Sequence, residues 1–122
     1  MTIWQLKEKS LGCGYTIVMD GTTKTGEAVD FGYTATLEAG TLDVPDSVSV
    51  ILADDPGDTA SKITVAGVVT AAATGYSVAA VLGTTSTAAL SGKWYYEVKE
   101  LRDTNASYPY GGCLWFDEKV EG

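Results

Sequence analysis

The chain has 122 residues, of which 16 are acidic, eight are basic and none is histidine, giving a formal charge of −8. This length fits one domain whose core is large enough to fold without metal or disulfide support. The acidic field repels phosphate backbones and anionic lipid headgroups, so we expect neither nucleic acid nor a membrane among the partners. Without histidine the chain lacks the commonest general base and transition-metal ligand, and we expect a non-enzymatic protein without a cofactor.

The first ten residues mix three apolar side chains, Ile3, Trp4 and Leu6, with charged ones. The charges break the apolar run too early for a signal peptide or a membrane anchor. We interpret residues 1–10 as an edge strand or an arm, docked on its own domain or on a neighbouring chain, and residues 11–122 as the folded domain. The three apolar side chains are therefore candidate partner-binding residues.

Several segments alternate between apolar and polar residues, as strands with one buried face do. Residues 11–19 end at the turn dipeptide Asp20-Gly21. Residues 28–38 place Phe31, Tyr33, Ala35 and Leu37 on one face, and after a corner at Pro45 the alternation resumes over residues 48–52. These segments predict half-buried strands of an all-β domain.

Two groups of residues are candidates for metal binding or for disulfide formation. Asp54, Asp55 and Asp58 offer carboxylate oxygens of the kind that calcium prefers, but the surrounding Asp-Pro-Gly sequence is ordinary turn chemistry, so no metal is expected. Cys13 and Cys113 are expected to be reduced, half-buried thiols of a protein made in a cytosol. The first and last strands of a sandwich can be neighbours, which leaves open that the two cysteines pair.

The second half of the chain begins with two short strands over residues 62–74, around a turn at Ala66-Gly67. A strand over residues 76–82 follows, and then one helical turn at about residues 84–91. Thr84 or Thr85 would cap this turn, Leu90 would fill the core, and Gly92 would take the positive φ at its exit.

The next strand carries Trp94, Tyr96 and Val98 on one face, with Tyr95 and other polar residues opposite. Because tryptophan buries more area than any other side chain, Trp94 is the predicted core anchor. A loop over residues 103–107 leads to the last strand, residues 108–116. In this strand we single out Tyr108, Tyr110 and Trp115 as candidate partner-binding residues.

The order of these segments resembles the small immunoglobulin-like domains in virion proteins of tailed bacteriophages, such as head and tail accessory proteins and upper-baseplate N-terminal domains. The most telling part is Thr-Thr-Ser-Thr-Ala-Ala-Leu-Ser-Gly-Lys-Trp-Tyr-Tyr-Glu-Val over residues 84–98, similar to the family's Thr-Ala-Ala-Leu-x-Gly-x-Tyr-x-Tyr-Glu-Val. The resemblance spans about residues 11–117. Here Asp20-Gly21 is further from Val29-Asp30-Phe31-Gly32 than in the family, which leaves the order of the first strands open.

The resemblance implies a single immunoglobulin-like antiparallel β-sandwich that acts as a structural virion component, assembled in the host bacterial cytoplasm. We expect a capsid decoration protein, or a head or tail fibre or baseplate adaptor, that is oligomeric or bound to a lattice of capsid, tail or fibre subunits. The alternative is a carbohydrate-binding module for a cell-surface glycan. Its stacking platform would consist of Tyr95, Tyr108, Tyr110 and Trp115.

Overall fold

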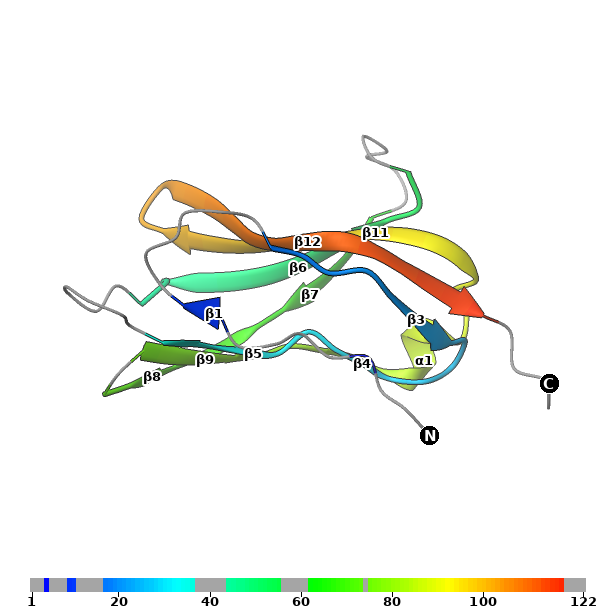
Figure 1. Ribbon diagram of the computed structural model, residues 1–122, viewed down its shortest axis with the longest axis horizontal. Coiled ribbons are helices and arrows are strands. Elements are labelled where there is room, and N and C mark those ends of the chain that lie inside the picture. Colours follow the sequence, from blue (N-terminus) through cyan, green and yellow to red (C-terminus); the bar gives the residue numbers. More distant parts are fainter. Residues whose placement is uncertain are drawn as a thin grey trace.

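The computed structural model describes Trp4 and residues 9–10, 17–36, 44–55, 62–73 and 75–117, with only the backbone of residues 9–10. Two layers of strands face each other, and the predicted all-β sandwich is confirmed (Figure 1). The single described helix, α1 (Thr84–Thr87), lies at one end of the sandwich. Among the described residues, no helix has the length and apolar character needed to cross a membrane.

One layer is a six-stranded sheet around the long hairpin of β11 and β12. Its strands are, in spatial order, β2 (Ile17–Val18), β12 (Asn105–Asp117), β11 (Gly92–Arg102), β6 (Ser47–Ala53) and β7 (Ile63–Ala66), with β3 (Gly21–Lys24) also on β12. The other layer is a four-stranded sheet and a short pair beside it. The four strands are β1 (Lys9–Ser10), β5 (Tyr33–Thr36), β9 (Gly75–Ala79) and β8 (Val68–Ala72), and the pair is β4 (Val29–Asp30) with β10 (Val81–Leu82).

The resemblance implied antiparallel sheets, but some of the strand pairs are parallel. Strands β2 and β3 both run parallel to β12, and β1 runs parallel to β5. Two parallel strands cannot be joined by a hairpin. Strands β2 and β3 come from the N-terminal part of the sequence, and their partner β12 comes from the C-terminal part. The first and last segments are therefore neighbours, although Cys13 lies outside the described residues and Cys113 is a free, half-buried thiol.

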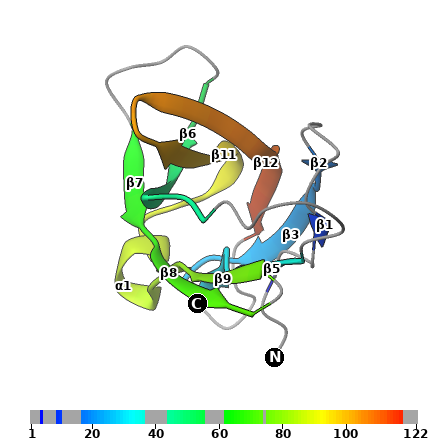
Figure 2. The ribbon, with the colours of Figure 1, turned by 90° about the vertical axis from the view of Figure 1, so that its left-hand side faces the viewer.

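The two predicted short strands around Gly67 are present, but they do not pair with each other. Strand β7 pairs with β6 in the six-stranded sheet, whereas β8 pairs with β9 in the other layer. Figure 2 shows β7 descending along the side of the sandwich into β8. Gly67 donates its N–H to the Val48 carbonyl at 2.8 Å, and a Cβ there would crowd the Val48 and Val78 side chains. Glycine therefore lets the chain change sheets at this point.

The core is built mainly from alternate residues of the strands. Phe31, Tyr33 and Ala35 are buried as predicted, while Leu37 lies outside the described residues. Tyr96 and Val98 are buried too, but the prediction of Trp94 as the core anchor is wrong. Trp94 is half-buried near the start of β11, and its indole N–H donates to the Ser91 carbonyl at 3.3 Å. Its position at the end of the sandwich leaves part of the large ring in water.

The predicted position of the helical turn is confirmed, but the predicted N-cap is wrong. Leu90 is buried and Gly92 has a φ of 77°, as expected. The N-cap is Gly83, which makes no side-chain hydrogen bond, so neither predicted threonine caps the turn. Thr87 instead is buried and donates to the Thr84 carbonyl at 3.2 Å.

Trp4 docks on its own domain. Its ring meets those of Phe31 and Tyr96 edge-on, with centroids 5.6 and 5.3 Å away, and its carbonyl accepts a hydrogen bond from the Asp30 N–H. The indole lies so close to Gly21 that a Cβ there would overlap it. The division at residue 10 stays a prediction, but Trp4 and β1 both contact the sandwich.

We expect Gly21→Ala to displace the Trp4 ring and to lower the free energy of unfolding by about 2 kcal/mol, a typical cost of overpacking. Chemical denaturation followed by tryptophan fluorescence measures both effects. The comparison variant is Gly83→Ala, where nothing lies within 4 Å of a Cβ and we expect only the smaller cost of placing alanine at an N-cap. Equal stabilities of the two variants would show that Trp4 does not dock as described.

Candidate functional site

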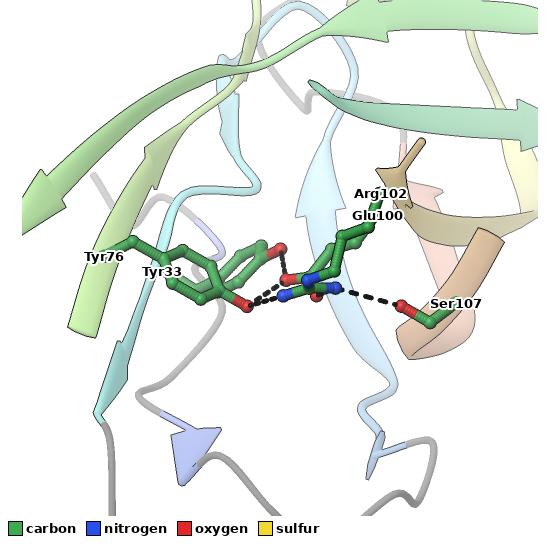
Figure 3. Close-up of polar contacts among 5 residues, drawn as sticks. All are labelled: Tyr33, Tyr76, Glu100, Arg102 and Ser107. Atoms are coloured by element: carbon green, nitrogen blue, oxygen red, sulfur yellow. Dashed lines mark hydrogen bonds and ion pairs between the residues drawn. The ribbon is translucent and has the colours of Figure 1, made fainter. Parts of the chain in front are cut away.

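Two clusters concentrate polar or aromatic side chains, one within the core and one on the surface. The first is the Glu100 network between the two layers, which consists of Tyr33, Tyr76, Glu100 and Arg102 (Figure 3). The second is the outer groove, an open hollow of about 820 Å³ on the solvent face of the six-stranded sheet. The first cluster joins the sheets, whereas the second is accessible to a partner.

Glu100 is a carboxylate at a core-facing position, only 1% exposed. Its Oε2 accepts hydrogen bonds from the hydroxyls of Tyr33 at 2.5 Å and Tyr76 at 2.6 Å. Arg102 Nη1 lies 3.1 Å from the other oxygen, Oε1, in an ion pair. Since a buried charge is tolerated only when it is paired and hydrogen-bonded, these three partners account for the position of Glu100.

The partners of Glu100 come from both layers. Tyr33 and Tyr76 lie on the adjacent strands β5 and β9, whereas Glu100 and Arg102 lie two residues apart on β11. Arg102 also donates to the Tyr76 hydroxyl at 3.3 Å and to Ser107 Oγ at 3.5 Å. The network thus ties the two sheets together near the β11–β12 turn. Its buried carboxylate is shielded from substrates, so its evident role is structural.

Burial, together with the carboxylate of Glu100, raises the pKa of Tyr33 and of Tyr76 above the ordinary tyrosine value. Burial also raises the pKa of Tyr96, whose hydroxyl donates to the Met19 carbonyl at 2.7 Å. All three hydroxyls are hydrogen-bond donors. The folded state therefore favours their protonated form.

The outer groove follows from where small residues fall on the sheet. Tyr95 on β11 pairs with Cys113 on one side and Ala53 on the other, and Glu97 pairs with Gly111. These small neighbours leave a hollow beside the large rings. The lining residues are Val18, Asp20, Ile51, Ala53, Lys62, Tyr95, Tyr96, Glu97, Tyr108, Tyr110, Gly111, Gly112 and Cys113.

An exposed aromatic group adjoins the groove. Trp115 on β12 is 47% exposed and is the cross-strand partner of Lys93. The Lys93 ammonium lies 5.0 Å from the Tyr95 ring centroid and 5.6 Å from that of Trp115. A hydrogen bond to Tyr95 raises the pKa of Lys93, whose ammonium is already charged at neutral pH. The surface therefore combines aromatic rings with a fixed positive charge.

The candidate partner-binding residues separate in the structure. Trp115 and Tyr108, the latter 41% exposed, lie on the solvent face as expected. Tyr110 is fully buried, and its ring packs 5.0 Å from that of Tyr33, so its assignment to an exposed platform is wrong. Trp4 packs on the core of its own domain, and Ile3 and Leu6 lie outside the described residues.

A β-bulge explains the error at Tyr110. Val98 pairs with Tyr110 and Glu100 pairs with Ser107, so one extra residue is inserted in β12 between these pairs. The insertion includes Pro109, which has no N–H for the ladder and is confined to bulges and edges. The bulge changes the phase of the alternation, and Tyr108 and Tyr110 do not share a face. A proline inside a predicted strand was the signal for it.

The acidic residues near the β6 end form no metal centre that the structure describes. Asp54 and Asp55 are exposed, and Asp58 is outside the described residues. Within those ranges, no three His, Cys, Asp or Glu side chains lie close enough together to hold a metal ion.

The sequence reasoning missed Glu100 and the role of Lys93. Glu100 falls on the same face of β11 as Tyr96 and Val98, and an acidic residue in that apolar series was an available signal. Its tyrosine partners, 67 and 24 residues away, could not be inferred from spacing. A scan against models of known protein families and a search of curated proteins found no match to this chain.

Proposed function

We propose that the protein is a non-enzymatic structural component of a tailed-phage virion and that it binds a neighbouring subunit through the outer groove. The observation that carries this proposal is the grouping of exposed hydrophobic side chains. Of the five described large hydrophobic residues with the greatest exposure, Val18, Tyr108 and Trp115 lie on the six-stranded sheet. Clustered exposed apolar residues are typical of interaction sites.

The chemistry of the groove supports a protein partner. Tryptophan and tyrosine are enriched among the residues that dominate protein–protein binding energy. The opposite charges of Lys62 and Glu97 on the lining suit an interface with a polar rim. The virion assignment itself depends on the resemblance of residues 84–98 to phage immunoglobulin-like domains. A capsid, tail or fibre subunit is the partner that this combination favours.

The carbohydrate alternative is weakened by two features of the same surface. Tyr110 lies at the lining of the groove, but it is fully buried and its ring packs on Tyr33, so it offers no face to a sugar. Lys93 lies over the rings of Tyr95 and Trp115, where a stacked sugar would have to displace it. A flat, unobstructed aromatic face is what sugar stacking requires, so we favour protein adhesion.

The test is incorporation of variants into particles of the phage that encodes the protein. We expect the double variant Tyr108→Ser/Trp115→Ser to fold normally, because both side chains are exposed, and to be incorporated at least about tenfold less than wild type. Quantitative mass spectrometry of purified particles gives the copy number. The control is Val81→Ser, a 55% exposed valine on β10, in the other layer.

Equal incorporation of the groove variant and the control would overturn the proposed binding face. Thermal unfolding of each purified variant checks that a loss does not reflect misfolding. A glycan array with wild-type protein tests the carbohydrate-binding alternative. Saturable binding of a sugar that also protects the tryptophan fluorescence would favour that alternative over protein adhesion.

A further inference from the structure

Strand β8 forms an open edge of the four-stranded sheet. It pairs with β9 from Val68 opposite Ala79 to Ala72 opposite Gly75, and no described strand lies on its other side. Four of its five residues are exposed, with Val68 at 65%. In such a strand, every second residue points its N–H and C=O away from the sheet.

This edge lacks the features with which proteins usually protect an edge strand. Lysine, proline and other charged residues normally prevent unwanted pairing. Three other edge strands have a lysine in or next to the strand: Lys9 in β1, Lys24 in β3 and Lys62 before β7. By contrast, residues 63–92 contain no charged residue and no proline. An unprotected edge in an otherwise charged protein indicates a pairing surface.

We infer that β8 pairs antiparallel with β8 of a second copy of this chain, joining two four-stranded sheets into one continuous sheet. Two copies of a protein with a charge of −8 repel each other over most orientations. Approach along the uncharged β8 edge avoids bringing carboxylates together. Across a two-fold axis, β8 of one copy would contact β8 of the other copy. Its Val, Thr and Ala side chains are uncharged and can pack against the same side chains of the second copy.

The pairing strand is short, so the contact is weaker than a standard interface. An interface that buries less than the usual area is typical of transient complexes. We therefore expect a dimer with a dissociation constant in the micromolar range in free solution. Copies held close together on a larger assembly would pair more readily, because their effective concentration is higher.

Sedimentation equilibrium over about 1–500 µM tests the inference. We expect the wild-type protein to shift from monomer to dimer and Val68→Lys/Thr70→Lys to stay monomeric over the whole range. Lysines on both copies would face one another across the pair, and like charges directly opposite are destabilising. The matched control, Val81→Lys/Thr84→Lys, makes the same change of charge at exposed positions outside β8 and should dimerise like wild type.

Hydrogen exchange locates the contact independently of the variants. Raising the wild-type concentration should slow exchange of β8 amides that point away from β9, without slowing amides of the outer groove. A monomer at every concentration, or equal dimerisation of the β8 variant and the control, would overturn the inference. Neither result bears on incorporation of the groove variants, so this inference and the proposed function can fail separately.

Discussion

Replacing Glu100 with leucine should lower the free energy of unfolding by about 4 kcal/mol, because it removes one partner of a buried ion pair. Leucine has a similar volume, so the loss comes mainly from the missing acceptor. The hydroxyls of Tyr33 and Tyr76 and the guanidinium of Arg102 would lose the oxygen atoms they contact at 2.5, 2.6 and 3.1 Å. Chemical denaturation of the two proteins measures the difference.

The control is Glu97→Leu, because Glu97 lies on the same strand with its side chain exposed. We expect that change to cost less than about 0.5 kcal/mol. Adding Tyr33→Phe and Tyr76→Phe to Glu100→Leu should recover part of the loss, since the two buried hydroxyls that lost this acceptor are then removed as well. A cost for Glu100→Leu no greater than that of Glu97→Leu would show that the network does not hold the sheets together.

Alkaline conditions should unfold the protein steeply because three buried tyrosines keep their protons in the folded state. The folded-state pKa values of Tyr33, Tyr76 and Tyr96 are raised, whereas unfolded tyrosines ionise near pH 10. Above that pH the unfolded chain binds fewer protons than the folded one, so stability falls as pH rises. Each tyrosine contributes up to about 1.4 kcal/mol per pH unit, or about 4 kcal/mol for the three.

Denaturation at a series of pH values from about 9 to 11.5 measures this slope. Tyr33→Phe should reduce the slope by one proton, and Tyr33→Phe/Tyr76→Phe by two, while other titrating groups cancel in the comparison. Slopes that are identical in wild type and both variants would contradict the assignment of these hydroxyls as buried donors.

The alternation of residues was sufficient to predict the layered fold, because each half-buried strand carries its own pattern. Tyr96 and Val98 were placed correctly on this basis. The same reasoning failed at Tyr110, where the bulge at Pro109 changes the phase of the strand. Local periodicity predicts which face a residue occupies only as long as the strand has no insertion.

The parts that could not be predicted depend on contacts between distant segments. Trp4 packs on Phe31 and Tyr96, and Glu100 binds Tyr33 and Tyr76, through a topology that spacing does not reveal. The outer groove likewise arises where Gly111, Cys113 and Ala53 meet across three strands. A hollow formed by small residues on separate strands can be predicted only when the register of those strands is known.

The most direct test of the proposed function is a cryo-electron microscopy reconstruction of particles produced by a phage whose genome encodes this chain. Adhesion through the outer groove predicts density for the sandwich on the particle, with Tyr108 and Trp115 covered by a capsid, tail or fibre subunit. A reconstruction in which the sandwich is present but its six-stranded face is open to solvent, or particles that contain no copy of the protein, would contradict it.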